Sequence, residues 1–181
     1  LSRSRAAAYA LYVLAMAGEA DIGQVRYFHD NRLRDEPSPL ARAQIGAALA
    51  HMGDRARSRN AFRMAEQALG YRNTGDWYQT PLRDLAGVIA LAADAGETEM
   101  VDRLRRRLER DAPDAGELMT QEQVQLLLAA HTLQDRAGPV NVTLNGALSW
   151  PARKVITREA AKITGPEMVA FFAQIEARYP A

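Results

Sequence analysis

The residues whose chemistry could support a metal site are few and scattered. The three histidines, His29, His51 and His131, lie far apart, and none has another histidine or a suitably spaced pair of acids within four residues. A metal centre needs convergent ligands and supporting hydrogen bonds, so we interpret all three histidines as structural. His131 lies in the apolar run LLLAAHTL, where burial would favour its neutral form.

Other catalytic residue patterns are equally sparse. The sequence contains no cysteine, which excludes disulfides, thiolate metal sites and a cysteine nucleophile. It also has no phosphate loop, nucleophile elbow, zinc-ligand spacing or dinucleotide fingerprint. We therefore expect a protein that is not an enzyme and that binds no cofactor and no metal.

The charge distribution argues against nucleic acid and membranes as partners. Lysine and arginine total 23 against 22 for aspartate and glutamate, and a net charge of +1 creates no long-range attraction for polyanions. The run from Asp102 to Arg110 mixes arginines with acids and leucines, which favours the solvated face of an outer helix. The longest uncharged stretch, from Ala6 to Gly18, is shorter than the roughly 20 residues of a membrane span and predicts a buried helix instead.

The segment from Tyr71 to Thr80 is the best candidate for a contact site. Its sequence, YRNTGDWYQT, places aromatic residues in a polar, glycine-containing loop between helices. Exposed aromatic side chains in loops often make protein contacts, although Trp77 and Tyr78 could instead fold back over the helix ends. The predicted interaction residues are Tyr71, Asp76, Trp77, Tyr78 and Gln79.

The elements that must position these residues are helices with clear boundaries. N-cap residues, first-turn prolines and terminal glycines fall between apolar runs at the places where helix ends need them. The predicted starts are Ser38, Asp54, Thr80, Thr98 and Thr120, and the predicted stops are Gly53, Gly70, Gly96 and Gly138. With two further helices before Glu36, the sequence predicts seven.

Two kinds of helix alternate along the chain. The first, third, fifth and seventh contain the apolar runs YALYVLAMA, IGAALA, LAGVIALAA and VQLLLAA, whereas the fourth and sixth have one apolar stripe flanked by charge. A helix that is apolar all round must be buried, and an amphipathic one covers it. Similar junctions recur at Gly18, Gly53 and Gly96, which indicates an internal repeat of inner and outer helices, either an α-solenoid or a closed double layer.

The pattern changes after Pro139. The segment VNVTLNGALSW alternates apolar and polar residues around Asn145-Gly146, which predicts a short β hairpin, and residues 154–157 could supply another strand. The stretch from Pro166 to Tyr179 predicts a final amphipathic helix. We therefore expect a mainly α fold with a helical-repeat domain at 1–138 and a small β segment plus C-terminal helix at 139–181.

Several segments resemble bacterial α-2-macroglobulins. They are YALYVLAMAGEADIG, PLARAQIGAALAHMGDRARSRNAF, YQTPLRDLAGVIAL and LMTQEQVQLLLAA followed by NVTLNG. The resemblance covers roughly Ala7 to Gly146, and its more specific parts are Leu82-Arg83-Asp84 and Thr120-Gln121-Glu122. It implies the later part of the thioester-bearing, complement-like α/α-toroid domain and the start of the following β-rich piece.

In that family the whole protein is a periplasmic protease trap. A bait region is cut, the molecule rearranges, and a cysteine–glutamine thioester can capture the protease. The motif Cys-Leu-Glu-Gln does not occur here, and no residue of a cysteine-free chain can carry the covalent step. The resemblance therefore implies a fragment that supplies scaffold and contact surface, with target proteases and neighbouring macroglobulin domains as partners and the periplasm or cell envelope as location.

Two alternatives remain open at the level of the sequence. A tetratricopeptide-like adaptor would repeat every 34 or so residues, and the interval from Gly53 to Gly96 is longer. An α/α-barrel enzyme needs paired acids around a cavity, but Asp84 and Asp94 lie near opposite ends of one predicted helix and Glu122 lies at a helix start. A partial toroid should expose apolar inner-helix surface, so we expect association or marginal stability when this chain is expressed alone.

Overall fold

The computed structural model describes residues 3–70, 79–111, 118–137, 142–149 and 154–160. The chain divides into two compact units, Leu1–Leu133 and Gln134–Ala181, and each is considered by itself. The final helix predicted at 166–179 lies outside the described residues. The predicted domain boundary after residue 138 stays a prediction.

The described residues form seven α-helices and one short 3₁₀ turn, which confirms the mainly helical fold class. Their bounds are α1 (Arg3–Met16), α2 (Ile22–Asn31), η1 (Leu33–Asp35), α3 (Pro39–His51), α4 (Arg55–Ala68), α5 (Pro81–Ala95), α6 (Thr98–Asp111) and α7 (Thr120–Ala137).

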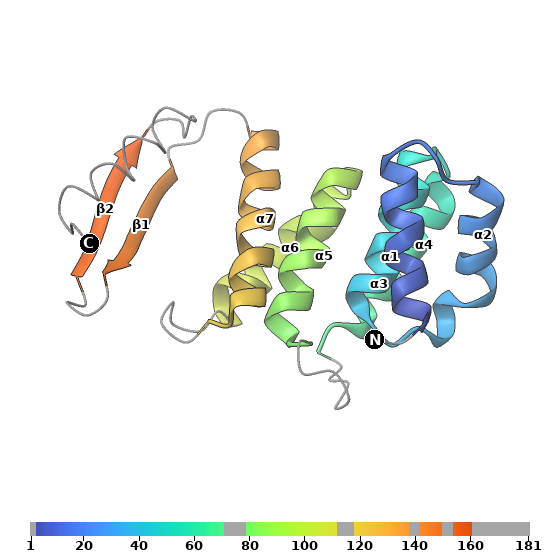
Figure 1. Cartoon of the computed structure of the whole chain (residues 1–181), viewed down its shortest axis with the longest axis horizontal. Coiled ribbons are helices and arrows are strands. Elements are labelled where there is room, and N and C mark those ends of the chain that lie inside the picture. Colours follow the sequence, from blue (N-terminus) through green and yellow to red (C-terminus); the bar gives the residue numbers. More distant parts are fainter. Residues whose placement is uncertain (1–2, 71–78, 112–117, 138–141, 150–153, 161–181) are drawn as a thin grey trace. The chain divides into compact units, whose positions relative to one another are not determined.

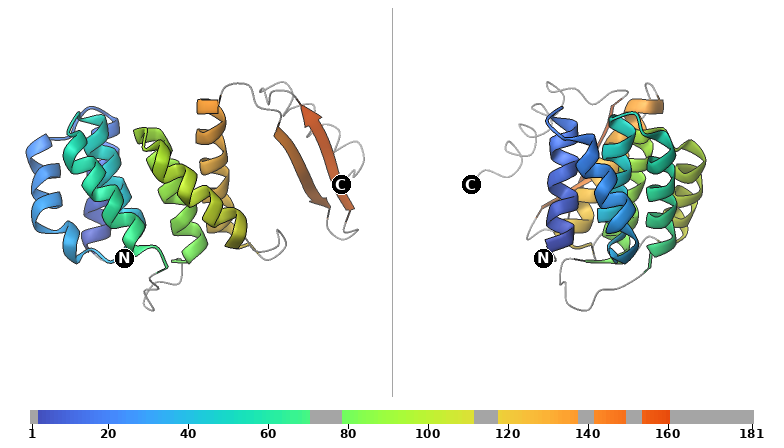
Figure 2. Two further views of the ribbon diagram at one scale, coloured as in Figure 1. Left: turned by 180° about the vertical axis from the view of Figure 1, so that it is seen from behind. Right: turned by 90° about the vertical axis from the view of Figure 1, so that its right-hand side faces the viewer.

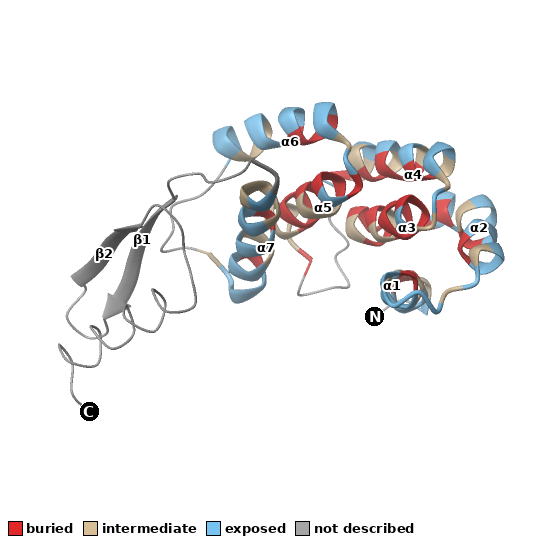
Figure 3. Cartoon of the chain, turned by 90° about the horizontal axis from the view of Figure 1, so that it is seen from above, coloured by how far each residue is buried: buried red, intermediate tan, exposed pale blue. Residues whose placement is uncertain are grey.

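The helices of unit 1 form two layers. An inner row holds α1, α3, α5 and the part of α7 that belongs to this unit, and an outer row holds α2, α4 and α6 (Figures 1 and 3). Seen from behind, the outer helices lie over the inner ones (Figure 2). The predicted alternation of inner and outer helices is therefore correct for the described part of the chain.

Burial is uneven along the inner row. Helices α3 and α5 each bury nine residues, whereas α1 buries only Arg5, Ala8 and Ala15. The prediction that every inner helix is buried is thus wrong for α1 and α7. An inner helix loses its solvent exposure only when helices cover both of its sides, and within unit 1 the described residues provide α1 and α7 with an inner-row neighbour on one side only (Figure 3).

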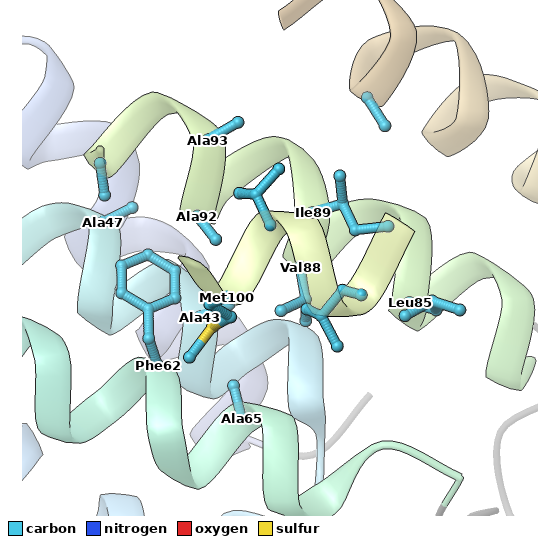
Figure 4. Close-up of a cluster of buried hydrophobic side chains, with 14 of the residues drawn as sticks. Ala43, Ala47, Phe62, Ala65, Leu85, Val88, Ile89, Ala92, Ala93 and Met100 are labelled. Atoms are coloured by element: carbon cyan, nitrogen blue, oxygen red, sulfur yellow. The ribbon is translucent and has the colours of Figure 1, made fainter. Parts of the chain in front are cut away.

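The main core lies between α3, α4, α5 and α6. Phe62 of α4 is fully buried against the small side chains of α3 and the aliphatic side chains of α5 (Figure 4). Gly46 permits this approach, since a Cβ at that position would lie 3.0 Å from the Phe62 ring. A second cluster joins α1, α2 and η1 to α3 and α4 through residues that include Val25 and Leu33.

The predicted repeat reappears as one turn used three times. After α1, α3 and α5, a glycine with positive φ is followed by an acidic residue whose N–H donates to a carbonyl five residues earlier. The three bonds are Glu19 to Leu14 at 2.9 Å, Asp54 to Leu49 at 2.8 Å and Glu97 to Ala92 at 2.9 Å. The same turn therefore leads from an inner helix to the following outer helix each time.

Unit 2 contains two described strands. β1 (Val142–Ser149) pairs antiparallel with β2 (Lys154–Ala160), with Val142 opposite Ala160 and Ser149 opposite Lys154. The register shifts between Asn145 and Ala147, so Asn145 and Gly146 lie inside β1. The sequence-based prediction of a turn at this dipeptide is therefore wrong. The dipeptide lies at an irregularity within the strand, of the kind that a β-bulge makes, and a bulge accommodates an additional residue and often a glycine.

Candidate functional site

Most of the predicted contact loop lies outside the described residues. Tyr71, Asp76, Trp77 and Tyr78 fall in the stretch 71–78, so their role as contact residues stays a prediction. Gln79 is described, and its side chain is buried with 7% exposure. It accepts a hydrogen bond from Arg5 and donates one to Asp84, so in this structure it links α1 to α5.

Gln79 belongs to a chain of buried polar side chains at the N-terminal ends of the inner helices. We call this set the polar seam; it consists of Arg5, Glu36, Gln79, Arg83 and Asp84. Arg5 Nη2 donates to Gln79 Oε1 at 3.2 Å, and Gln79 Nε2 donates to Asp84 Oδ2 at 2.9 Å. Arg5 Nε lies 3.7 Å from Glu36 Oε1, and Arg83 Nη2 donates to Asp84 Oδ1 at 2.7 Å. The polar seam therefore joins α1, the segment before α3, and α5.

The electrostatics of the polar seam are those of a buried, balanced cluster. Asp84 is 1% exposed, and this burial raises the pKa of its carboxyl against the opposing effects of Arg83, Gln79 and Arg5. A buried charge is tolerated when it is paired and hydrogen-bonded, and removal of one partner is costly. A cluster of this kind fixes the positions of the helices that it joins.

A second polar link joins α5 to α7. Thr80 caps α5 by accepting from the backbone N–H of Arg83 at 3.1 Å, and its Oγ1 donates to Glu122 Oε1 at 2.6 Å. The other oxygen of Glu122 accepts from the N–H of Met119 at 2.9 Å, at the start of α7. One threonine thus starts α5 and holds the neighbouring inner helix α7.

The two segments that resemble the family most specifically, Leu82-Arg83-Asp84 and Thr120-Gln121-Glu122, both take part in these contacts. Arg83 and Asp84 belong to the polar seam, and Glu122 is the partner of Thr80. The sequence alone identified both segments but gave them no common role.

Arginine side chains also close the layer interface by binding backbone carbonyls. Arg42 of α3 donates to the carbonyls of Glu36 at 2.6 Å, Met64 at 2.8 Å and Arg34 at 3.1 Å. Burial lowers the pKa of this guanidinium. These hydrogen bonds link η1 and α4 to α3.

The histidines do not form a site in the described structure. His29 contacts Asp30 at 2.7 Å and Asn60 at 3.1 Å, which ties α2 to α4. His131 is exposed, so the expectation that it is buried is wrong. Within the described residues, no group of three histidine, cysteine or acidic side chains could hold a metal ion.

The charged run of α6 behaves as the sequence predicted. Its arginines pair with acids on the outer surface, including Arg103 with Glu66 at 3.1 Å and Arg105 with Glu109 at 3.5 Å. Such exposed pairs neutralise the helix face and leave no uniformly basic surface for a polyanion. The interpretation of this run as a solvated outer face is confirmed.

The described residues leave two apolar surfaces uncovered at the edges of unit 1. The edge groove lies between α1 and α2, has a volume of about 720 Å³, and is lined by residues that include Ala10, Leu14 and Tyr27. The edge ridge consists of Val124, Leu127 and Leu128 on α7, exposed by 48%, 66% and 50%. Clustered exposed apolar residues of this kind mark contact surfaces.

The two layers of helices and the polar seam define a helical-repeat scaffold. No established family signature matches the chain. The α-2-macroglobulin of Escherichia coli (strain K12) is 33% identical over 137 residues, which is 72% of this chain and 8% of that protein.

Solved structures agree with this sequence match. The native conformation of E. coli α-2-macroglobulin, from electron cryo-microscopy, superposes with a TM-score of 0.62 at 30% identity over 84% of this chain and 9% of that one. Salmonella α-2-macroglobulin reacted with methylamine gives a TM-score of 0.59 at 26% identity over 88% of this chain and 11% of that one. The chain belongs to the bacterial α-2-macroglobulin family.

The family assignment bears on the other expectations. These relatives are protease inhibitors and not enzymes, which agrees at the family level with the expectation of a non-enzyme, and neither alternative class is supported. The chain spans only about a tenth of the relatives' length. Among the described helices, none combines the length and apolar character needed to cross a membrane.

Proposed function

We propose that this chain works as part of a bacterial protease trap of the α-2-macroglobulin type, in the periplasm or cell envelope. In the parent protein it supplies a rigid arc of an α/α toroid and a surface for neighbouring macroglobulin domains. Target proteases meet the parent protein, and the chain itself, without cysteine, contributes no thioester.

The observation that carries this proposal is the contrast between a locked interior and uncovered edges. The polar seam and the Thr80–Glu122 bond fix the inner helices at one end, and the Phe62 cluster fixes α3 to α6. A scaffold that must transmit a rearrangement between domains needs such internal rigidity, because a soft element would absorb the movement. The edge groove and edge ridge then supply contact surface.

Two further parts of the proposal concern less central segments. The β1–β2 pair would begin the β-rich piece that follows the toroid, and the loop residues Tyr71, Asp76, Trp77, Tyr78 and Gln79 would border an inter-domain contact. The position of Gln79 supports the second idea, because its side chain joins the polar seam directly after residues 71–78.

An exchange experiment tests the proposed function. The matching stretch of E. coli α-2-macroglobulin is replaced by this chain, and inhibition of a protease is measured with a large protein substrate. We expect the exchanged protein to inhibit, because the scaffold and its edges are equivalent. The same exchange carrying Asp84→Ala is the matched control and should lose inhibition together with thermal stability. A folded exchanged protein that does not inhibit would contradict the proposal.

A further inference from the structure

Helices α2 and α4 are neighbours in the outer row (Figure 3), and His29 of α2 lies at their contact. Each of its two ring nitrogens faces one side-chain partner. Nδ1 lies 2.7 Å from Oδ1 of Asp30, and Nε2 lies 3.1 Å from Oδ1 of Asn60 on α4. Because the His29 side chain is only 11% exposed, water is a poor substitute for either partner.

The partner of Nδ1 can only accept a hydrogen bond. Hydrogen bonds from Arg57 and His29 lower the pKa of Asp30 to about 2, so its carboxyl group is ionised at neutral pH. An ionised carboxylate has no hydrogen to donate. A bare Nδ1 would place its lone pair against a negative oxygen, so Nδ1 carries a hydrogen in the neutral ring as well as in the protonated ring.

The partner of Nε2 can either donate or accept, because Asn60 carries an amide. A neutral ring with its hydrogen on Nδ1 has a bare Nε2, which needs a donor, and the amide NH2 group supplies one. A protonated ring has an N–H at Nε2, which needs an acceptor, and the amide oxygen supplies one. The structure places Oδ1 of Asn60 against Nε2, which is the arrangement that suits the protonated ring.

Two charged side chains act on this contact with opposite effects. The carboxylate of Asp30 favours a positive ring, whereas Arg57 of α4, which donates to both oxygens of Asp30 at 3.0 Å, opposes it. Arg57 also donates to Asp54 at 3.2 Å, and Asp54 accepts from Arg26 of α2 at 2.7 Å. The histidine ring is therefore the member of this network whose charge responds to small changes of pH near neutrality.

We propose that His29, Asp30 and Asn60 form a proton-dependent switch between the outer helices α2 and α4. When His29 takes up a proton at Nε2, Asn60 turns its amide oxygen towards the ring, and when that proton leaves, the amide turns its NH2 group there instead. The link between the helices persists in both states, but it is stronger in the protonated state, where the donor is charged. This inference uses only contacts within unit 1 and does not depend on the proposed role in a protease trap.

A nuclear magnetic resonance titration of the unaltered full chain, labelled with nitrogen-15, tests the switch without any substitution. We expect Nδ1 of His29 to keep its hydrogen at every pH while Nε2 alone titrates, and the amide signals of Asn60 to change with the same midpoint. The exposed rings of His51 and His131 serve as references. A neutral ring with its hydrogen on Nε2, or Asn60 signals that ignore the titration of His29, would overturn the inference.

A double-mutant cycle then measures the link itself. His29→Ala, Asn60→Ala and the double variant are unfolded chemically at about pH 5 and about pH 8.5, on either side of the ordinary pKa of histidine. The coupling should change the unfolding equilibrium constant by at least about tenfold at the lower pH and by roughly fivefold at the higher. Gln67→Ala, on an exposed residue of α4, replaces Asn60→Ala in the matched control and should show no coupling to His29. Coupling that disappears at the higher pH would mean that the amide does not reverse.

Discussion

The middle of unit 1 and its two edges are made of similar sequence but differ in environment. Helices α3 and α5 bury almost their whole circumference, while α1 and α7 also carry apolar runs but leave Val13, Leu14, Leu127 and Leu128 exposed. The difference teaches that hydrophobicity identifies an inner helix, whereas burial depends on how many neighbours surround it. It also separates the residues that hold the fold from those available for contact.

The largest expected effect breaks the middle. Phe62→Ala should lower the free energy of unfolding by about 4 kcal/mol, since it empties a fully buried ring site between α3 and α5. Chemical denaturation monitored by circular dichroism measures the change. Leu127→Ala at the edge is the matched control and should cost less than about 0.5 kcal/mol. Equal losses at the two positions would remove the distinction between middle and edge.

The polar seam should be nearly as sensitive. Asp84→Ala leaves the buried groups of Arg83 and Gln79 without their shared acceptor and should cost about 3 kcal/mol. Asp84→Asn keeps an acceptor and should cost clearly less. The same residue should also make stability depend on pH. The pKa of Asp84 is raised in the folded chain, so folding takes up a proton at pH values between the unfolded and the folded pKa. The contribution of Asp84 to stability therefore falls as the pH rises through this range. Measured as a difference in the free energy of unfolding, the cost of Asp84→Asn should therefore shrink as the pH rises. A cost that grows with pH would contradict the raised pKa of Asp84.

A smaller effect is expected where α5 meets α7. Thr80→Ala removes a helix cap and the hydrogen bond to Glu122, at a cost of roughly 1–2 kcal/mol. Thr80→Ser keeps the hydroxyl and should recover most of the loss. Thermal unfolding curves compare the three proteins, and a serine variant as unstable as the alanine variant would exclude the hydroxyl as the cause.

The outer surface should respond least. Hydrogen bonds from Arg57 and His29 lower the pKa of Asp30 to about 2. The stabilisation is therefore present above the unfolded pKa near 4 and is lost as the pH falls towards 2. Because the pair is exposed, it should contribute little to stability at neutral pH and less still in high salt. Unfolding of Asp30→Asn and the unaltered chain should converge on acidification, and a difference that widens would be inconsistent with this pKa.

Local signals in the sequence were enough for the helices. Ser38, Asp54 and Thr80 are observed as N-caps, and Gly96 ends α5 in the left-handed conformation, because capping depends on residues adjacent in sequence. The family resemblance was also correct, because it depended on short contiguous segments that are read directly from the sequence.

Long-range arrangements were not predictable in this way. Arg5 and Gln79 are 74 residues apart and gave no sign that they would share a hydrogen bond. The exposure of His131 was missed because an apolar run does not reveal whether a neighbour covers it. Asn145-Gly146 shows a further limit, because the same dipeptide suits a tight turn and a bulge, and only strand pairing distinguishes them.

Amide hydrogen exchange measures the contrast between middle and edges most directly. In the unaltered chain, the amides of α3 and α5 should exchange only through global unfolding, and those of α1 and α7 at least tenfold faster through local opening. Protection that is uniform across the four inner helices, or strongest in α1 and α7, would contradict the account.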